Sequence, residues 1–291
     1  MCTAVLSIVP GLPVLLAGIR DELTDRAWEP PGRHWPQYPG LIGGRDLLAG
    51  GTWLAVSPAG LRVACVLNGT GQRAQAARRR SRGVLPLLAA AGESLDRGTL
   101  ADLDPFRLVV AEPGRAVIQS WDGRDLVEQD LPSGLHLVVN SGLASDLAGR
   151  RQIGAEQQRA SQSGADQAGA ERLAVRPPDG REHEMARIAH FLGRFASAAR
   201  PDPRPGQAVS DAWGAWFPLV NGDGIGPADQ RALIVQRDLG GGRTWGTTSV
   251  SLVALAPGRL RYDFTGRPGD VTAWYSVLPT RPPHTTTDVP G

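Results

Sequence analysis

The chain has 291 residues, of which 41% are hydrophobic and 21% charged, which is ordinary for a globular protein with a full core. The formal net charge is +2 and the basic residues are all arginine, so no global field favours nucleic acid as a partner. Cys2 and Cys65 are too few for a disulfide framework and fit a reducing compartment, so we expect a cytoplasmic location.

Residues 1–19 carry no charge, but their pattern favours neither a signal peptide nor a membrane span. No basic residue precedes Arg20, as a signal peptide would require, and Pro10-Gly11 and Pro13 interrupt the apolar run. We therefore expect two short strands around a turn, over residues 2–9 and 12–19.

The middle of the chain alternates short apolar runs with turn residues. Residues 28–38, rich in proline and tryptophan, predict a rigid surface loop. Further along, we expect strands over 52–57, 61–67, 107–111, 115–121 and 135–139, and short helices over 83–91 and 99–103.

Large apolar residues nearly vanish over 151–182, which predicts a disordered insertion within a single domain spanning 1–291. After it, Met185, Ile188, Leu192 and Phe195 recur at helical spacing, so a helix over 184–199 should pack on a sheet. Strands are expected over 232–235, 247–255, 260–264 and 271–277, and the tail from 279 should be loose. Strands at both ends with helices between them indicate an α+β fold of two sheets covered by helices.

Cys2 is the first candidate for chemistry, because a small residue at position 2 favours removal of Met1. The new first residue would carry both a thiol and an α-amine, and the amine can accept the thiol proton. The competing interpretation is a small residue tolerated at a fraying chain end.

The hairpin should bring Arg20 and Asp21 beside Cys2. A carboxylate there can hold the α-ammonium, and an arginine can attract a thiolate and a substrate carboxylate; a surface cluster capping a turn is the alternative. Asn68 and Asn140 each end a predicted strand and could donate to an oxyanion, although asparagine there is often a turn residue.

Other candidates carry weaker signals. His34 is the one histidine we would test for ligand contact, and none of the five shows zinc-ligand spacing. The basic run 73–82 fits a solvated face better than an anion contact. Cys65, between Ala64 and Val66, should be a buried small residue.

The order Met-Cys-Thr, a hairpin, Arg-Asp-Glu and then Gly-Gly-Thr-Trp-Leu resembles the NRDE, or transport and Golgi organisation, family of bacteria and eukaryotes. Matching stretches are 1–3, 17–22, 28–35, 49–57, 66–68, 81–86 and 246–255. Ile19 departs from the pattern, since it stands where the family motif has an asparagine that could hydrogen-bond behind the site.

The family is in turn similar to choloylglycine hydrolases and penicillin V acylases, which are N-terminal-nucleophile cysteine amidases. This implies a four-layer αββα sandwich of two mainly antiparallel sheets. It also implies roles for five residues: Cys2 as nucleophile and base, Asp21 orienting the α-amine, Arg20 polarising the site, and Asn68 and Asn140 contacting the oxyanion. Those enzymes carry a further arginine on a late strand, whereas residues 247–251 have none and Arg243 lies just upstream.

Three hypotheses follow. The first is a hydrolase of non-peptide C–N amide bonds in small acyl amides, which needs no cofactor. The second, also suggested by the resemblance, is a non-catalytic protein that carries haem or an acyl-CoA-type hydrophobic metabolite, with His34, Trp35 and Trp53 as its candidate pocket residues. The third is an enzyme whose site has decayed.

Overall fold

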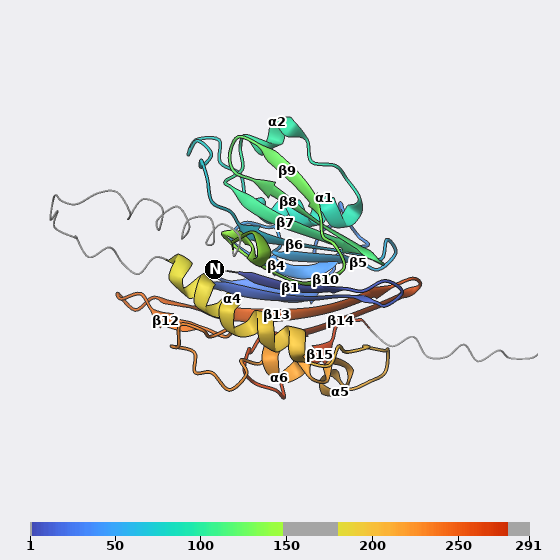
Figure 1. Ribbon diagram of the computed structural model, residues 1–291. Coiled ribbons are helices and arrows are strands. Elements are labelled where there is room, and N and C mark those ends of the chain that lie inside the picture. Colours follow the sequence, from blue (N-terminus) through green and yellow to red (C-terminus); the bar gives the residue numbers. More distant parts are fainter. Residues whose placement is uncertain (1, 148–179, 279–291) are drawn as a thin grey trace, which may run out of the picture.

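The computed structural model describes residues 2–147 and 180–278. Two antiparallel sheets stack face to face, with α1 and α2 on one outer side and α4, α5 and α6 on the other (Figure 1). The predicted α+β class and the four-layer αββα order are confirmed. Among the described residues, no helix combines the length and the apolar content that crossing a bilayer requires.

The first sheet has eight strands, and it contains strands from both ends of the described chain. Its order is β11 (Gly142–Leu143), β10 (Gly134–Val139), β1 (Thr3–Ile8), β2 (Val14–Leu23), β13 (Thr244–Ala256), β14 (Arg259–Thr265) and β15 (Tyr275–Ser276), with β12 (Gln236–Asp238) paired to β13. The N-terminal hairpin is present as predicted, and its register sets Thr3 opposite Ile19.

The second sheet has seven strands in sequence order. They are β3 (Trp28–Gly32), β4 (Ile42–Asp46), β5 (Leu54–Ser57), β6 (Arg62–Asn68), β7 (Phe106–Glu112), β8 (Arg115–Trp121) and β9 (Leu126–Asp130). The predicted loop over 28–38 therefore begins as an edge strand, where prolines are tolerated because that edge needs no N–H donors. The sequence reading missed β4 and β9 because β4 is glycine-rich and β9 is largely polar and exposed.

The helices are short except for α4. Those whose bounds lie within the described residues are η1 (Arg82–Val84), α1 (Leu85–Ala91), α2 (Arg97–Leu100), α4 (Gly180–Ser197), α5 (Val209–Trp213) and α6 (Trp216–Val220). Residues 180–182 of the predicted insertion belong to α4, while residues 151–179 and the predicted tail from 279 lie outside the described residues. Trp213 ends α5 and Trp216 begins α6, and both indoles are buried in the core that these helices form with the first sheet.

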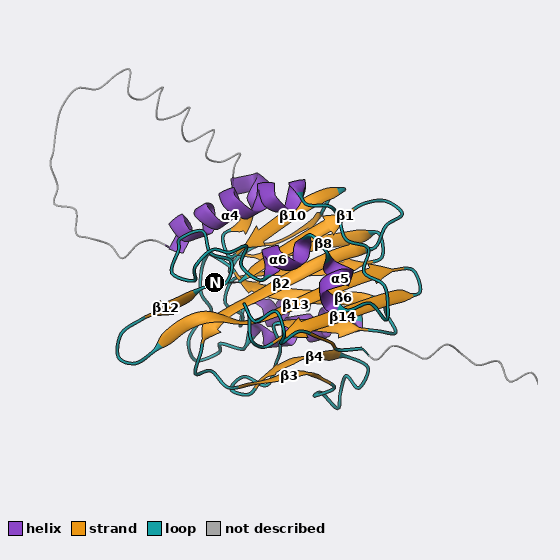
Figure 2. Ribbon diagram, turned by 90° about the horizontal axis from the view of Figure 1, so that it is seen from below, coloured by secondary structure: helices purple, strands orange, loops and turns teal. Residues whose placement is uncertain are grey.

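Strand β2 separates two cores, because successive side chains of a strand point to opposite faces. Val14 and Leu16 lie in the core between the two sheets, whereas Leu15, Ala17 and Ile19 lie in the core beneath α4, α5 and α6. Figure 2 shows these helices on the outer face of the eight-stranded sheet. The same alternation continues to the end of β2 and decides where its charged residues point.

Candidate active site

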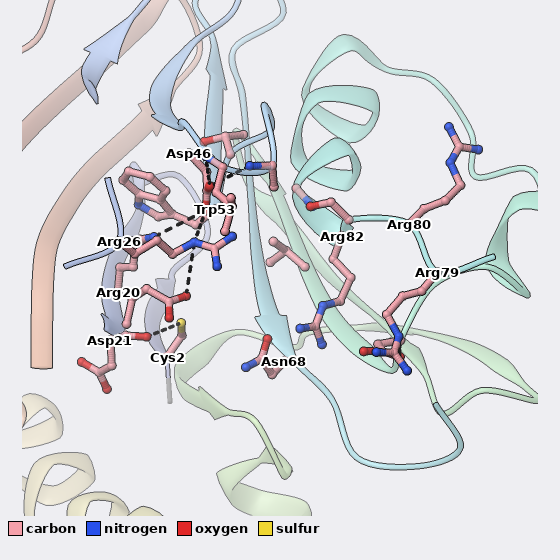
Figure 3. Close-up of a pocket in the computed structure, with 18 residues that line it drawn as sticks. Cys2, Arg20, Asp21, Arg26, Asp46, Trp53, Asn68, Arg79, Arg80 and Arg82 are labelled. Atoms are coloured by element: carbon pink, nitrogen blue, oxygen red, sulfur yellow. Dashed lines mark hydrogen bonds and ion pairs between the residues drawn. The ribbon is translucent and has the colours of Figure 1, made fainter. Parts of the chain in front are cut away.

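A cavity of about 390 Å³ opens beside Cys2 (Figure 3). One wall comes from Cys2 and the end of β2. The other comes from the segment before β5, the end of β6 and residues 79–83. All the lining residues that the structure describes lie between positions 2 and 104.

Cys2 is partly exposed and reaches the cavity from the start of β1. Its Sγ lies 4.0 Å from the main-chain oxygen of Asp21, and its nitrogen lies 3.4 Å from Oδ1 of Asn140. Residue 21 thus approaches the thiol with its backbone, and Asn140, expected at the oxyanion, lies at the Cys2 nitrogen. Cys65 is buried in the core between the sheets, and this burial raises the pKa of its thiol.

Arg20 lies on the cavity face of β2 and is held in place by several contacts. Nη1 donates a 2.7 Å hydrogen bond to Oγ1 of Thr248, and the guanidinium sits 4.4 Å from the centre of the Trp53 ring. A carboxylate oxygen of Asp46 lies 3.7 Å from Nη2. Burial lowers the pKa of Arg20 from its ordinary value, while the nearby Cys2, Glu22 and Asp46 act in the opposite direction. The result is a fixed cation next to the thiol.

Asp21 points its carboxylate to the other face of the sheet. Oδ2 accepts a 3.2 Å ion-paired hydrogen bond from Nη1 of Arg187, and Oδ1 accepts one of 2.7 Å from Thr247. Nη1 of Arg187 also donates to Oγ1 of Thr3 at 2.7 Å. Among the described residues, no hydrogen bond joins this carboxylate to the Cys2 nitrogen. That role therefore stays a prediction for the chain that begins at Cys2.

The two asparagines occupy different positions. Asn68, at the end of β6, lines the cavity, and its side-chain amide has no hydrogen-bond partner within residues 2–147 and 180–278. Asn140, which follows β10, accepts from the Cys2 nitrogen and is not among the residues that line the cavity. Asn68 is thus placed to donate to a bound carbonyl oxygen, and Asn140 to orient the nitrogen.

Of the three candidate ligand-pocket residues, the structure brings only Trp53 to the described lining of this cavity. His34 makes its contacts with Pro30 O at 2.8 Å and the Glu29 carboxylate at 3.5 Å. Trp35 is buried and donates its indole N–H to Gly50 O.

Four contributors to the site were not singled out from the sequence. Arg187 was not predicted as a site residue because it lies on the buried side of an otherwise ordinary amphipathic helix. A charged residue on the apolar face of a helix could have indicated a buried ion pair. Thr247 and Thr248 depend on a bulge in β13, where the register with β2 shifts between Thr247 and Ser249. Asp46 ends the missed strand β4.

Arg243, considered as the late-strand arginine of the related amidases, lies instead in the exposed turn between β12 and β13.

Within the described parts of the chain, no three histidine, cysteine, aspartate or glutamate side chains cluster as metal ligands would. In comparisons with known proteins, a family described as Transport and Golgi organisation 2 matches residues 1–167. No curated protein matches the chain. The matched segment contains all the described residues that line the cavity, whereas Arg187, Thr247 and Thr248 lie beyond it.

Proposed function

The chain belongs to the transport and Golgi organisation 2 family, and on this premise we propose that it hydrolyses non-peptide C–N amide bonds in small acyl amides. The observation that carries this proposal is the placement of Cys2 at the cavity, with Arg20 beside it and the unpaired amide of Asn68 on the opposite wall.

The reaction begins after Met1 is removed, when the α-amine of Cys2 takes the thiol proton and Sγ attacks the substrate carbonyl. Asn140 Oδ1, which already accepts from this nitrogen, orients the amine. The oxyanion that forms accepts from the Asn68 amide, and a donor of this kind lowers the activation free energy by about 3 kcal/mol.

The tetrahedral adduct then collapses. The C–N bond breaks, the ammonium gives its proton to the leaving amine, and an acyl-thioester remains on Sγ. Water, activated by the same amine, hydrolyses the thioester to a carboxylic acid and restores the thiol. The products are one acid and one amine per water consumed, so no oxidant or reductant is required.

A carrier of haem or of an acyl-CoA-type metabolite is the alternative, and the contacts of its candidate ligand residue give it less support. Its histidine, His34, is engaged with Pro30 and Glu29 and is not part of the cavity lining.

A chain with one lysine inserted between Met1 and Cys2 tests the free amine without changing any side chain of the site. The inserted lysine, directly after Met1, is too large for Met1 to be removed, so the Cys2 nitrogen stays an amide. We expect the wild-type chain to lose Met1, as read by intact mass, and to hydrolyse members of an N-acyl amino acid panel. The extended chain and Cys2→Ala should both be inactive, while Cys65→Ala, which removes the other thiol, should retain activity. Full turnover by Cys2→Ala or by the extended chain would overturn the proposal.

A further inference from the structure

Arg82 extends from the wall opposite Cys2, and its guanidinium points toward Asn68 and the cavity (Figure 3). Its Nη1 donates a 2.8 Å hydrogen bond to Pro105 O, and the same oxygen accepts from the N–H of Gly69 at 2.8 Å. This shared carbonyl fixes Arg82 beside the Asn68–Gly69 segment. The remaining N–H groups of the guanidinium make no hydrogen bond to a described residue.

Three other arginines of the cavity lining have partners within the protein. They are Arg20 with Trp53 and Thr248, Arg26 with Asp46, and Arg79 with Asp104. Arg80 is exposed and points away from Cys2 in Figure 3. Arg82 is partly buried, and it forms no ion pair with any residue that the structure describes. Burial lowers the pKa of Arg82, while nearby Asp104 and Cys2 act in the opposite direction.

The backbone that carries Arg82 is held rigidly. Thr52 N–H donates to Gly83 O at 2.9 Å, and a Cβ on Gly51 would lie 2.5 Å from the Gly83 carbonyl carbon. This close approach requires glycine at position 51, and it locks the segment 81–83 to the turn before β5. The cation is therefore positioned before any ligand arrives, which lowers the entropic cost of binding.

Another part of the cavity lining is apolar. Leu48 and Ala49 line it, and Leu48 is 77% exposed. A basic group near Asn68 and an apolar rim suit a ligand that has an anionic end and a hydrocarbon end.

We propose that Arg82 binds an anionic group of the substrate, a carboxylate or a phosphate, at a distance from the amide that reacts. The site would then take anionic acyl amides rather than neutral ones. The planar guanidinium presents paired N–H donors that match either group. The proposal names the substrate class of the hydrolase above and rests on it. Its test, however, needs only a reactive Cys2 open to the cavity.

The test compares alkylation of Cys2 by iodoacetate, an anion, with alkylation by the neutral iodoacetamide, followed by intact mass. Cys65 is buried and its pKa is raised, so labelling reports on Cys2, and a Cys65→Ala background verifies this. We expect the ratio of the iodoacetate rate to the iodoacetamide rate to fall about tenfold in Arg82→Gln, because the attraction for the anion is lost. Arg82→Lys, which keeps the charge, should retain most of the ratio.

Arg80→Gln is the matched control, since it removes the same charge from the same cavity lining but from a side chain that points away from Cys2. An equal fall in Arg80→Gln would mean a diffuse field and would overturn the proposal. So would an unchanged ratio in Arg82→Gln, or equal slowing of both reagents, because Arg82 would then act on the thiol itself. A Cys2 that reacts with neither reagent would mean that its thiol is not open to the cavity, and this too would overturn the proposal, which requires an accessible site around Cys2.

Protection of Cys2 from iodoacetamide distinguishes the two anions. N-octanoylglycine and octyl phosphate are the anionic probes, and N-octanoylglycinamide is the neutral one. We expect at least one anion to protect the wild-type chain about tenfold better than the neutral amide, and the stronger of the two identifies the group. Protection by the neutral amide alone would count against the proposal. If anions protect while no amide is hydrolysed, the anion site stands and the hydrolase proposal fails.

Discussion

The two parts of the chain that flank residues 148–179 contribute differently to the site. The first part supplies the cavity lining as far as the structure describes it, including Cys2, Arg20 and Asn68. The second supplies side chains that hydrogen-bond to residues of the first, namely Arg187 on α4 and Thr247 and Thr248 on β13. The family match at 1–167 covers the first part and stops before the second. A family pattern can therefore mark the residues of a site while leaving out those that position them.

The sharpest test of this comparison is Arg187→Met. The change removes the buried partner of Asp21, whose side chain has no exposed surface, and also the hydrogen bond to Thr3. An unpaired buried carboxylate is costly, so we expect the free energy of unfolding in urea to fall by about 3–5 kcal/mol. If the second part merely covers the sheet, the loss should stay below about 1 kcal/mol.

Arg259→Met serves as the matched control, because Arg259 pairs with the exposed Asp202 on the surface. That change should cost about 0.5 kcal/mol. Adding Asp21→Asn to Arg187→Met should recover part of the lost stability, since the variant then buries no charge.

The stabilising contacts that the first part of the chain makes at the cavity are tested by Asp46→Asn. Burial of Asp46 tends to raise its pKa, but hydrogen bonds from Arg26 and Ala49 and the charges of Arg26 and Arg20 hold it below its ordinary value. The ionised carboxylate therefore stabilises the folded chain at pH values above the unfolded pKa, about 3.9. This contribution is lost as the pH falls through the lower folded pKa.

At pH 7 we expect Asp46→Asn to lower the free energy of unfolding by about 2 kcal/mol, because Asp46 accepts a charged hydrogen bond of 2.7 Å from Arg26. The difference from wild type should shrink as the pH falls below about 4, as followed by urea unfolding at a series of pH values. Asp130→Asn, at an exposed ion pair, is the control and should change little. A difference that stays constant down to pH 3 would show that the carboxylate is not the stabilising group.

Sequence alone was enough for the layers and for the hairpin that brings Arg20 and Asp21 to Cys2, because alternation and turn residues are local signals. Alternation also places Arg20 and Asp21 on opposite faces of one strand. The expectation that both side chains face Cys2 did not use that fact. Asn140 was expected at the site as an oxyanion contact, but its contact with the Cys2 nitrogen was not predicted, and Arg187 was not placed at all, since these contacts join residues more than 130 positions apart. Thr248 depended on a bulge, and no pattern in the sequence marks one there.

The smallest expected effect is that of Thr248→Val, which tests whether the second part of the chain fixes Arg20. Thr248 Oγ1 accepts from Nη1 of Arg20 at 2.7 Å and donates to the main-chain oxygen of Arg20 at 3.3 Å. Valine keeps the shape and removes both bonds, while Arg20 retains Trp53 and Asp46 as neighbours. We therefore expect a loss of only about 1 kcal/mol in the free energy of unfolding. Thr248→Ser keeps the hydroxyl and should restore most of it, which separates the hydrogen bond from packing at the bulge. If serine behaves like valine, the hydroxyl does not hold the arginine, and the contribution of β13 to the cavity is reduced to shape.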